Sequence, residues 1–224
     1  MCTPSCILFG ALNLKEEEIQ GKAVIEVGSL DVNGSLRPLL ESLKPKKYVG
    51  VDISKGRGVD VICNAEDLFQ KFQKESFDVL ISTELLEHVR DWRRVICNFK
   101  NVVKPDGIIL ITTRSPGFHY HGYPYDFWRY EIQDMENIFS DCIIEKIEKD
   151  PISPGVFIKA RKPRDFVEAD LSGYSLHSVI FNRRASSLSD EDLRRFSIHY
   201  TLRRRLKAYF LLGFKMAEVV KRRP

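Results

Sequence analysis

Long apolar runs are missing from this sequence. The two longest candidates, Ile108–Ile111 and Tyr209–Phe214, fall far short of the roughly 20 residues that a helix needs to span a bilayer. The first ten residues contain no Lys or Arg ahead of their short apolar stretch, so they do not match a secretory signal peptide. We therefore expect a protein with neither a membrane-spanning helix nor a signal peptide.

Paired cysteine motifs are also missing. No two cysteines form a Cys-x-x-Cys pair, which argues against a zinc ribbon and a thioredoxin-type redox site. Their odd number and scattered spacing favour reduced thiols in a cytoplasmic protein. The five are Cys2, Cys6, Cys63, Cys97 and Cys142.

Basic residues do not predominate outside the C-terminal segment. Residues 183–224 hold 12 Lys or Arg against 4 Asp or Glu, which leaves 23 basic and 27 acidic residues in 1–182. A mildly acidic body argues against a broad nucleic-acid-binding surface, so no nucleic-acid partner is expected.

Short apolar segments alternate with helical patterns over the first 112 residues. This alternation predicts a doubly wound, mostly parallel sheet. Ser35 is suited to cap one helix, and Pro45 to end it. A turn is expected at residues 105–107. We expect strands at 22–27, 47–51, 59–62, 77–82 and 108–112, and helices at 15–20, 36–43, 65–74 and 91–103.

The final part of the sheet has a different pattern. After a helix near 131–139, strands are expected at 142–148 and 155–160, with only a Pro- and Gly-containing turn between them. Two strands joined in this way pair antiparallel. We expect one domain over 1–162, followed by an extension over 163–224: an irregular linker at 163–188 and two basic amphipathic helices near 190–198 and 201–221.

Unusual residues stand at the ends of three expected strands. They are the Glu26–Gly34 loop, Asp52 about 20 residues beyond the loop glycine, and the Asn64–Asp67 turn. In open α/β sheets, ligands bind beyond the carboxyl ends of the strands. A simple turn or a helix cap accounts for each feature alone, but their recurrence in order favours a nucleoside site.

The dinucleotide fingerprint G-x-G-x-x-G is absent, since Gly34 is the first glycine after Gly28. A pyrophosphate needs several backbone N–H groups at close approach. The looser loop therefore favours S-adenosylmethionine over NAD.

Six segments follow one another in order: Val24–Ser29, Tyr48–Asp52, Asn64–Leu68, Phe77–Ser82, Glu84–His88 and Lys104–Gly107. They resemble the successive motifs of class I S-adenosylmethionine-dependent methyltransferases, above all the branch that modifies small molecules and glycans. The resemblance covers about residues 20–160. It implies a Rossmann-like methyltransferase fold and S-adenosylmethionine as the cofactor.

The resemblance also implies cofactor contacts. Glu26 and Gly28 would lie beside the methionine end, Asp52 on the ribose, and Thr83 and Glu84 on the floor near the sulfonium. The chain departs from the family at Asp31 and Asn33, whose roles stay open, and at Asn64, where Asp is common. The implied set also contains Ser29, Ile53 against the adenine, Ala65 and Glu66 at its edge, and His88, which either braces the next helix or contacts cofactor or acceptor.

The loop at 114–129 is rich in aromatic residues and carries His119, His121 and Asp126. Its place after the fifth strand predicts a wall of the acceptor pocket, which we expect within 113–130. The alternative is that its aromatic residues close the core. A hydroxyl acceptor must lose a proton, so we hypothesise that His119 or His121 takes this proton or hydrogen-bonds the acceptor oxygen, with Asp126 as a third catalytic candidate. His-x-His with a later Asp is a metal-binding pattern, but no second carboxylate lies near in sequence, so no metal is expected.

Basic and apolar residues are mixed over 200–223. One interpretation is an interfacial helix on anionic lipid, which suits a lipid-linked glycan acceptor in a cytoplasmic, membrane-peripheral protein. The other is a helix that packs on the domain or on a second copy in a homodimer, with a solvated basic face.

These observations together predict a methyltransferase that acts on a small molecule or saccharide, with oxygen as the favoured atom. One rival is an NAD-linked oxidoreductase. The other is a non-catalytic methyltransferase-like scaffold whose tail binds a membrane or partner.

Overall fold

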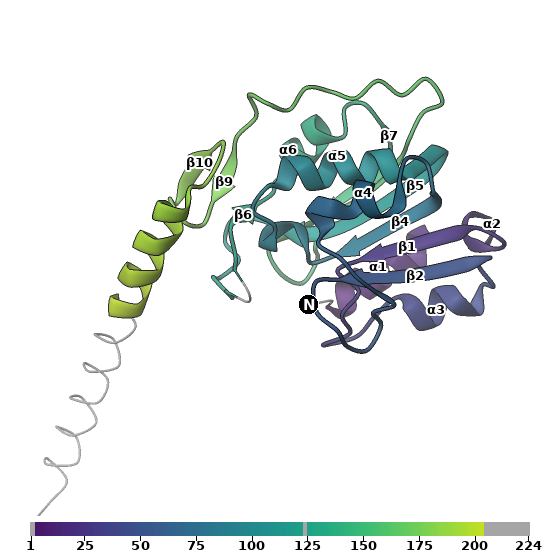
Figure 1. Ribbon diagram of the computed structural model, residues 1–224, viewed down its shortest axis with the longest axis horizontal. Coiled ribbons are helices and arrows are strands. Elements are labelled where there is room, and N and C mark those ends of the chain that lie inside the picture. The colour runs from purple at the N-terminus through teal and green to yellow at the C-terminus, as the bar shows by residue number, and fades with distance from the viewer. Residues whose placement is uncertain (1–2, 123–124, 204–224) are drawn as a thin grey trace, which may run out of the picture. The chain divides into compact units, whose positions relative to one another are not determined.

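The computed structural model describes residues 3–122 and 125–203. The chain divides into two compact units, Met1–Ser186 and Ser187–Pro224. The first unit contains the sheets of the described residues (Figure 1), and the second contains a helix that begins at residue 190.

The described residues of the first unit form a seven-stranded sheet with the order β3-β2-β1-β4-β5-β8-β7. The first five of these strands run parallel, whereas β8 is antiparallel to both of its neighbours. The predicted Rossmann-like methyltransferase fold is confirmed. The strands are β1 (Ala23–Val27), β2 (Lys47–Asp52), β3 (Val61–Ile62), β4 (Phe77–Thr83), β5 (Val103–Arg114), β7 (Ile143–Lys149) and β8 (Gly155–Arg161).

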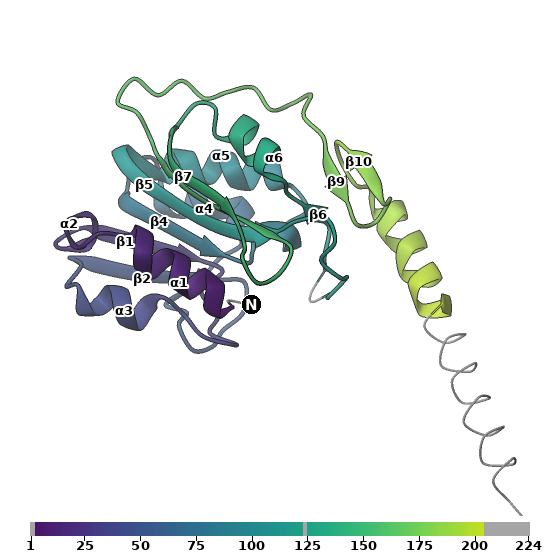
Figure 2. The same cartoon turned by 180° about the vertical axis from the view of Figure 1, so that it is seen from behind.

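Helices cover both faces of this sheet. In Figure 1, α4, α5 and α6 lie in front of the strands, and Figure 2 shows α1 on the opposite face. Side chains of α1 and α3 share one buried apolar cluster with β1, β4, β5 and β8. The helices are α1 (Pro4–Asn13), α2 (Glu16–Ile19), α3 (Arg37–Ser42), α4 (Leu68–Phe72), α5 (Trp92–Val102) and α6 (Ile132–Ile138), with 3-10 turns η1 (Ala65–Asp67) and η2 (Leu86–His88).

Helix α5 shows how local sequence fixes an element. Asp91 caps it, since its Oδ1 accepts a hydrogen bond from Arg94 N–H at 3.2 Å, which satisfies a donor that the first turn leaves unpaired. Apolar residues then recur at helical spacing. The buried members of that stripe are Trp92, Val95, Ile96, Phe99 and Val102.

The turn expected at 105–107 is wrong, because β5 continues through it. Asp106 has φ of 62°, and the register with β4 shifts between Phe77 and Val79. Hydrogen bonds to Lys162 keep the backbone in the sheet: Asp106 N–H donates to Lys162 O at 2.8 Å, and Lys162 N–H donates to Gly107 O at 2.9 Å.

The linker expected at 163–188 contains two strands, β9 (Leu176–Ser178) and β10 (Arg183–Ala185). With β6 (Trp128–Arg129) they form a second sheet of order β10-β9-β6. Arg93 of α5 donates to Leu171 O at 2.7 Å and to Ser186 O at 2.6 Å. Residues 163–186 therefore belong to the first compact unit, and the boundary expected after residue 162 lies after Ser186.

The helix of the second unit begins with a cap at Ser189. Asp192 N–H donates to Ser189 Oγ at 3.2 Å, and Ser189 N–H donates to Asp192 Oδ2 at 2.9 Å. The helix runs unbroken from 190 to 203, so the separation expected near 199–200 is wrong. Most of the expected helix at 201–221 and of the basic segment at 200–223 lies outside the described residues, and its contact with lipid or with a second copy stays a prediction.

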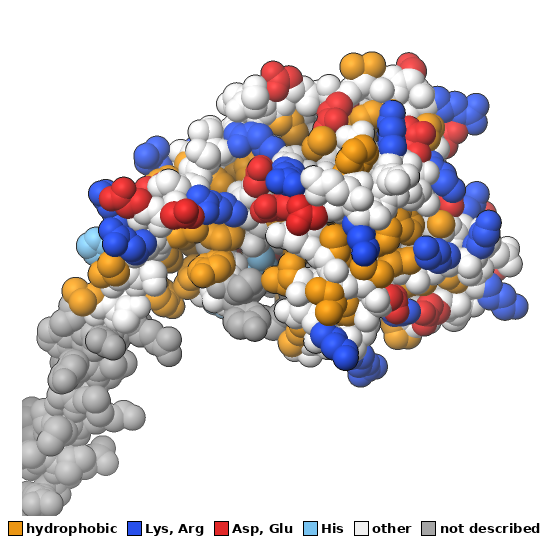
Figure 3. Space-filling model, in the orientation of Figure 1, with side chains coloured by type: hydrophobic (Ala, Val, Ile, Leu, Met, Phe, Trp, Pro, Cys, Tyr) orange, Lys and Arg blue, Asp and Glu red, His pale blue; other side chains and the backbone are white. Residues whose placement is uncertain are grey.

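In the described part of the chain, no helix combines the length and apolarity needed to cross a membrane. On the face that carries α4 and α5, Lys or Arg side chains are interspersed with Asp or Glu side chains (Figure 3).

Candidate active site

The carboxyl ends of β1, β2, β4 and β5 lie at one edge of the sheet because these strands are parallel. Every predicted site residue stands on one of these strands or on the segments that follow them, including the short strand β3. The edge has two parts: the cofactor edge, after β1, β2 and β3, and the acceptor side, after β4 and β5.

Glu26 is a buried carboxyl on β1. It is 2% exposed, and its Oε2 accepts a hydrogen bond from Tyr48 Oη at 2.8 Å. Burial raises its pKa from 4.5 to about 7, because the hydrogen bonds from Tyr48 and Ser35 and the charge of Arg37 oppose burial only in part. A cationic group beside Glu26 would favour its ionised form.

The loop after β1 is closely packed. Gly28 has φ of 82°, and a Cβ there would lie 3.1 Å from Leu85 Cβ. Among the described residues, Ser29 Oγ is buried without a hydrogen-bond partner. Asp31, whose role the sequence left open, binds the loop after β2: its N–H donates to Arg57 O at 2.9 Å and its carboxylate pairs with Arg57 Nε at 3.1 Å.

Asp52 ends β2 with its carboxylate partly exposed. Its Oδ1 accepts from Ser54 N–H at 2.9 Å, and its Oδ2 lies 3.4 Å from Leu30 N. Both partners are backbone groups, so the carboxylate keeps the capacity to accept from a ligand. Ile53 follows with 55% of its surface exposed.

The 3-10 turn η1 carries Ala65 and Glu66. Asn64 Oδ1 accepts from Glu66 N–H at 3.0 Å, so this amide caps the turn at the position where the family commonly has Asp. Asn98 of α5 donates to the carbonyls of both Ala65 and Glu66 at 2.9 Å, which fixes the turn against this helix.

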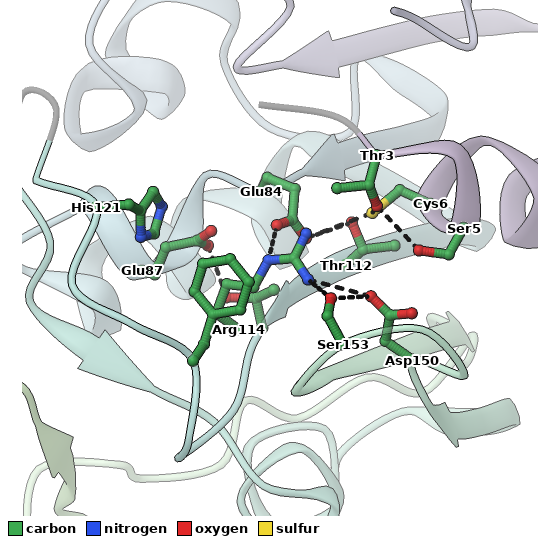
Figure 4. Close-up of polar contacts among 12 residues, drawn as sticks. Thr3, Ser5, Cys6, Glu84, Glu87, Thr112, Arg114, His121, Asp150 and Ser153 are labelled. Atoms are coloured by element: carbon green, nitrogen blue, oxygen red, sulfur yellow. Dashed lines mark hydrogen bonds and ion pairs between the residues drawn. The ribbon is translucent and has the colours of Figure 1, made fainter. Parts of the chain in front are cut away.

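On the acceptor side, Thr83 at the end of β4 and Glu84 after it are buried, and Figure 4 shows the Glu84 carboxylate beside Arg114, Thr112 and Cys6. The Glu84 carboxylate pairs with Arg114 Nε. It also accepts hydrogen bonds from Thr112 Oγ1 at 3.2 Å and from Cys6 Sγ at 3.4 Å. Burial, and next the charge of Glu87, raise its pKa well above the usual range, and Arg114 opposes this. Its place on the cofactor floor stays a prediction.

Arg114 holds a second buried carboxylate as well. Its Nη1 lies 3.1 Å from Asp150 Oδ2 and donates to Ser153 Oγ at 2.8 Å, and its guanidinium lies 4.4 Å from the ring centre of Phe118. Sequence reasoning missed this group. Arg114 was visible only as the first residue of the loop at 114–129, and Asp150 precedes a turn 36 residues later.

Glu87 and His88 lie on η2. Glu87 is fully buried, and its Oε2 accepts from Thr113 Oγ1 at 2.8 Å. Its Oε1 has no hydrogen-bond partner among the described residues and lies 4.0 Å from His88 Nε2. His88 also contacts the carbonyl of Tyr125 through Nδ1, so it braces the loop after β5.

His121 lies against these residues. Its Nε2 is 3.0 Å from His88 Nε2, and its Nδ1 is 3.0 Å from Asp126 Oδ2. The structure thus brings His88, His121 and Asp126 together. His119 makes no polar contact with this group: its side chain is exposed and stacks on Phe118, with ring centres 4.6 Å apart, and it meets the ring of His121 only edge-on, at 6.2 Å between ring centres.

Asp126 is a buried carboxylate with a strong partner. Arg129 donates to it through both terminal nitrogens, and His121 N–H donates to Oδ2 at 3.1 Å. Burial raises the pKa of Asp126, but the hydrogen bonds from Arg129 and His121 outweigh burial and hold it well below the usual range. Asp126 is therefore an ionised orienting group.

Several aromatic residues of this loop close the core. Phe127, Trp128 and Tyr130 are buried. Trp128 Nε1 donates to Arg90 O and Tyr130 Oη donates to Leu86 O, each at 3.1 Å. Tyr125 is exposed, and residue 123 lies outside the described residues.

The fold and this edge define the class of the protein, a Rossmann-like methyltransferase. A family model described as a methyltransferase domain matches residues 11–141, more than half of the chain. The chain belongs to this methyltransferase-domain family, and the resemblance found in its sequence is confirmed.

Curated relatives carry the same domain. The chain is 30% identical over 111 residues to phthiotriol/phenolphthiotriol dimycocerosates methyltransferase 1 of Mycobacterium ulcerans, a match over 44% of this chain and 40% of that protein. It is 27% identical over 120 residues to ubiquinone biosynthesis O-methyltransferase of Idiomarina loihiensis, which covers 48% of each chain. The matches thus span less than half the length of these relatives.

Among solved structures, the fold is similar to that of 1,6-didemethyltoxoflavin-N1-methyltransferase of Burkholderia thailandensis, which was crystallised with 1,6-didemethyltoxoflavin and S-adenosylhomocysteine. The TM-score is 0.55 and the sequence identity 12%, over 71% of this chain and 77% of that chain. At this identity the likeness supports the fold.

Proposed function

We propose that this protein transfers a methyl group from S-adenosylmethionine to a hydroxyl group of a small molecule or saccharide. The observation that carries the proposal is one sheet edge that combines Glu26, Gly28 and Asp52 with the polar groups of the acceptor side. The names of the relatives support a small-molecule acceptor, and the O-methyltransferase among them supports oxygen.

The residues of the cofactor edge fit the cofactor. Gly28, with its positive φ, leaves no side chain at the tightest point of the loop. Ser29 Oγ has no hydrogen-bond partner among the described residues, so it offers a polar atom to a ligand. Asp52 retains lone pairs for ribose hydroxyls, and Glu26 is suited to pair with an ammonium. When bound, S-adenosylmethionine supplies a methyl group on a sulfonium.

In this proposal the other predicted contacts keep their roles. The exposed Ile53 packs on the adenine, and η1 presents Ala65 and Glu66 at the adenine edge, where Asn98 fixes the turn. Thr83 lies at the end of β4, towards the methyl group.

The acceptor side aligns the hydroxyl and receives its proton. His121 is oriented by Asp126, which stays ionised because Arg129 neutralises it. We propose that the proton leaves at the polar group around His121. His119, exposed in the described chain, is retained as a contact to the acceptor rather than as the first proton acceptor. Alignment and exclusion of water then lower the barrier.

Calorimetry with S-adenosylmethionine and with NAD tests the cofactor assignment. We expect S-adenosylmethionine to bind, NAD not to bind, and Asp52→Asn to weaken S-adenosylmethionine binding at least tenfold, because a neutral amide accepts ribose hydrogen bonds less strongly than a carboxylate.

Asp106→Asn is the matched control, because it replaces the same type of side chain at the opposite edge of the sheet. There Asp106 pairs with the exposed Arg164. Its affinity should equal that of the unaltered protein. Binding of NAD with no heat from S-adenosylmethionine would sink the assignment and favour the oxidoreductase reading.

A further inference from the structure

We propose that Glu87, His88 and His121 form a binding site for a divalent transition-metal ion on the acceptor side. The binding of the ion stands on the geometry alone. Its role, holding the acceptor oxygen, rests on the proposed methyltransferase function.

The three side chains come from two segments that the fold brings together. One ligand atom from each lies within 4.8 Å of the other two. His88 Nε2 and His121 Nε2 are 3.0 Å apart, and Glu87 Oε1 is 4.0 Å from His88 Nε2. Ligand atoms on a shared ion, each at about 2.0–2.2 Å from it, lie roughly 3 Å apart, so only the carboxylate has to move closer.

The hydrogen bonds of the two rings fix where their lone pairs point. A backbone carbonyl only accepts, so His88 Nδ1, which contacts the Tyr125 carbonyl, carries a proton and leaves Nε2 as an acceptor. His121 Nδ1 lies 3.0 Å from the Asp126 carboxylate. The ring nitrogen and the carboxylate oxygen are not aligned for a full hydrogen bond. The negative charge of the Asp126 carboxylate nevertheless favours a proton on Nδ1.

Both Nε2 lone pairs therefore face each other across 3.0 Å. Two lone pairs at that distance repel each other unless a positive charge lies between them, either a proton or a metal ion. A carboxylate or carbonyl behind each metal-ligating histidine is the usual arrangement at metal sites. Here Asp126 and Tyr125 supply these two partners.

Glu87 favours the metal ion over the proton. Its side chain is fully buried and aimed at the two rings, and Oε1 has no hydrogen-bond partner among the described residues. A proton shared between the rings gives this oxygen only a contact at 4.0 Å, which is too long for a hydrogen bond, and a buried carboxylate oxygen without a hydrogen bond is unfavourable. A divalent ion satisfies both nitrogens and the oxygen at once.

This ligand set differs from the His119, His121 and Asp126 pattern in the sequence. His119 is exposed, and Asp126 is already neutralised by Arg129. The carboxylate that the pattern lacked comes from Glu87, 34 residues before His121 in the sequence.

Two imidazole nitrogens and one carboxylate oxygen suit zinc or a similar transition ion better than Mg²⁺ or Ca²⁺, which prefer oxygen ligands. Three protein ligands leave at least one position open. A hydroxyl oxygen of the acceptor at that position would be polarised by the ion, so its O–H bond would break more readily. Because His121 Nε2 would then bind the ion, the proton would pass to water instead of to His121. The oxygen then forms its bond to the methyl carbon as the carbon–sulfur bond breaks.

Metal binding to the chelator-treated full-length protein tests the site directly. Co²⁺, followed by its visible absorption, and Zn²⁺, followed by calorimetry, should each bind with a stoichiometry of one. Mg²⁺ at the same concentration should not compete. We expect Glu87→Gln, His88→Ala and His121→Ala each to weaken binding at least tenfold.

His119→Ala is the matched control, because it removes an exposed imidazole from the same loop. Its affinity for Co²⁺ should stay within twofold of that of the unaltered protein. Zn²⁺ should raise the melting temperature of the unaltered protein and of His119→Ala but not that of His88→Ala. Melting curves without metal identify any variant that has lost its fold. The ligands stand on two segments, so one folded variant from each segment is enough to test the site.

The opposite results are equally distinct. No Co²⁺ binding by the unaltered protein, or binding that persists in folded His88→Ala, overturns the proposal, since the ion then binds to other ligands such as the free thiols. Loss of binding in His119→Ala alone would assign the ion to the pattern seen in the sequence. Co²⁺ binding without S-adenosylmethionine binding would remove the proposed function and leave the metal site in place.

Discussion

The two parts of the ligand-binding edge differ in how their charges are held. At the cofactor edge, Asp31 and Asp52 bind backbone N–H groups and one exposed arginine, Arg57. On the acceptor side four carboxylates are buried: Glu84, Glu87, Asp126 and Asp150. Two buried arginines pair with three of them, Arg114 with Glu84 and Asp150, and Arg129 with Asp126.

This difference separates two ways to build a binding site. A buried charge is unfavourable unless it is paired, so the paired groups of the acceptor side have little freedom to move and can align a reactant. The carboxylates of the cofactor edge are free to exchange solvent for a ligand. We therefore expect substitutions on the acceptor side to act mainly on stability, and those at the cofactor edge mainly on binding.

The largest effect is expected at Arg114. Arg114→Met leaves Glu84 and Asp150 buried without their cation, and the loss of one partner of a buried pair costs about 3–5 kcal/mol. Arg57→Met at the cofactor edge removes an arginine whose side chain is 82% exposed, and exposed pairs contribute about 0–1 kcal/mol. Urea unfolding at pH 7 measures both free energies. Equal losses in the two variants would break the comparison.

The next effect is at Glu26, the buried exception at the cofactor edge. Its pKa is about 7 in the folded protein and 4.5 as an isolated side chain, so between these values the folded state binds more protons than the unfolded state. The free energy of unfolding therefore falls as pH rises through this window, by up to about 3 kcal/mol.

Glu26→Gln removes this dependence because the amide does not titrate. We expect the free energy of unfolding of the unaltered protein to be lower at pH 8 than at pH 4.5. Glu26→Gln should lack this difference. At pH 8 the same substitution should weaken S-adenosylmethionine binding, since the ammonium loses its carboxylate. A slope with pH that survives in Glu26→Gln would place the titrating group elsewhere.

The smallest effect is at Gly28. Its φ of 82° is a conformation that residues with a Cβ rarely adopt, and the added Cβ would lie 3.1 Å from Leu85 Cβ. Gly28→Ala should cost about 1–2 kcal/mol. Gly173→Ala, where nothing lies within 4 Å, should change stability by less than about 0.5 kcal/mol. Thermal melting separates the two, and an unaffected Gly28→Ala would mean that the loop relaxes freely.

Much of the cofactor edge could be predicted because its features are local. Gly28 and Asp52 follow apolar strand patterns directly, and Asn64, which follows the next strand, caps a turn through a backbone group only two residues away. The acceptor side could be predicted only as a loop rich in functional residues. The partners of those residues lie far along the chain, as with Arg114 and Asp150.

The sequence by itself determined the alternation of strands and helices, the antiparallel end of the sheet, and the residues at the strand ends, because hydrophobic periodicity and turn chemistry act between near neighbours. Only the tertiary structure decided that β9 pairs with β6, that Arg129 neutralises Asp126, and that Glu87 faces His88 and His121. These outcomes depend on which buried groups meet when distant segments pack, and on the need of each buried charge for a partner.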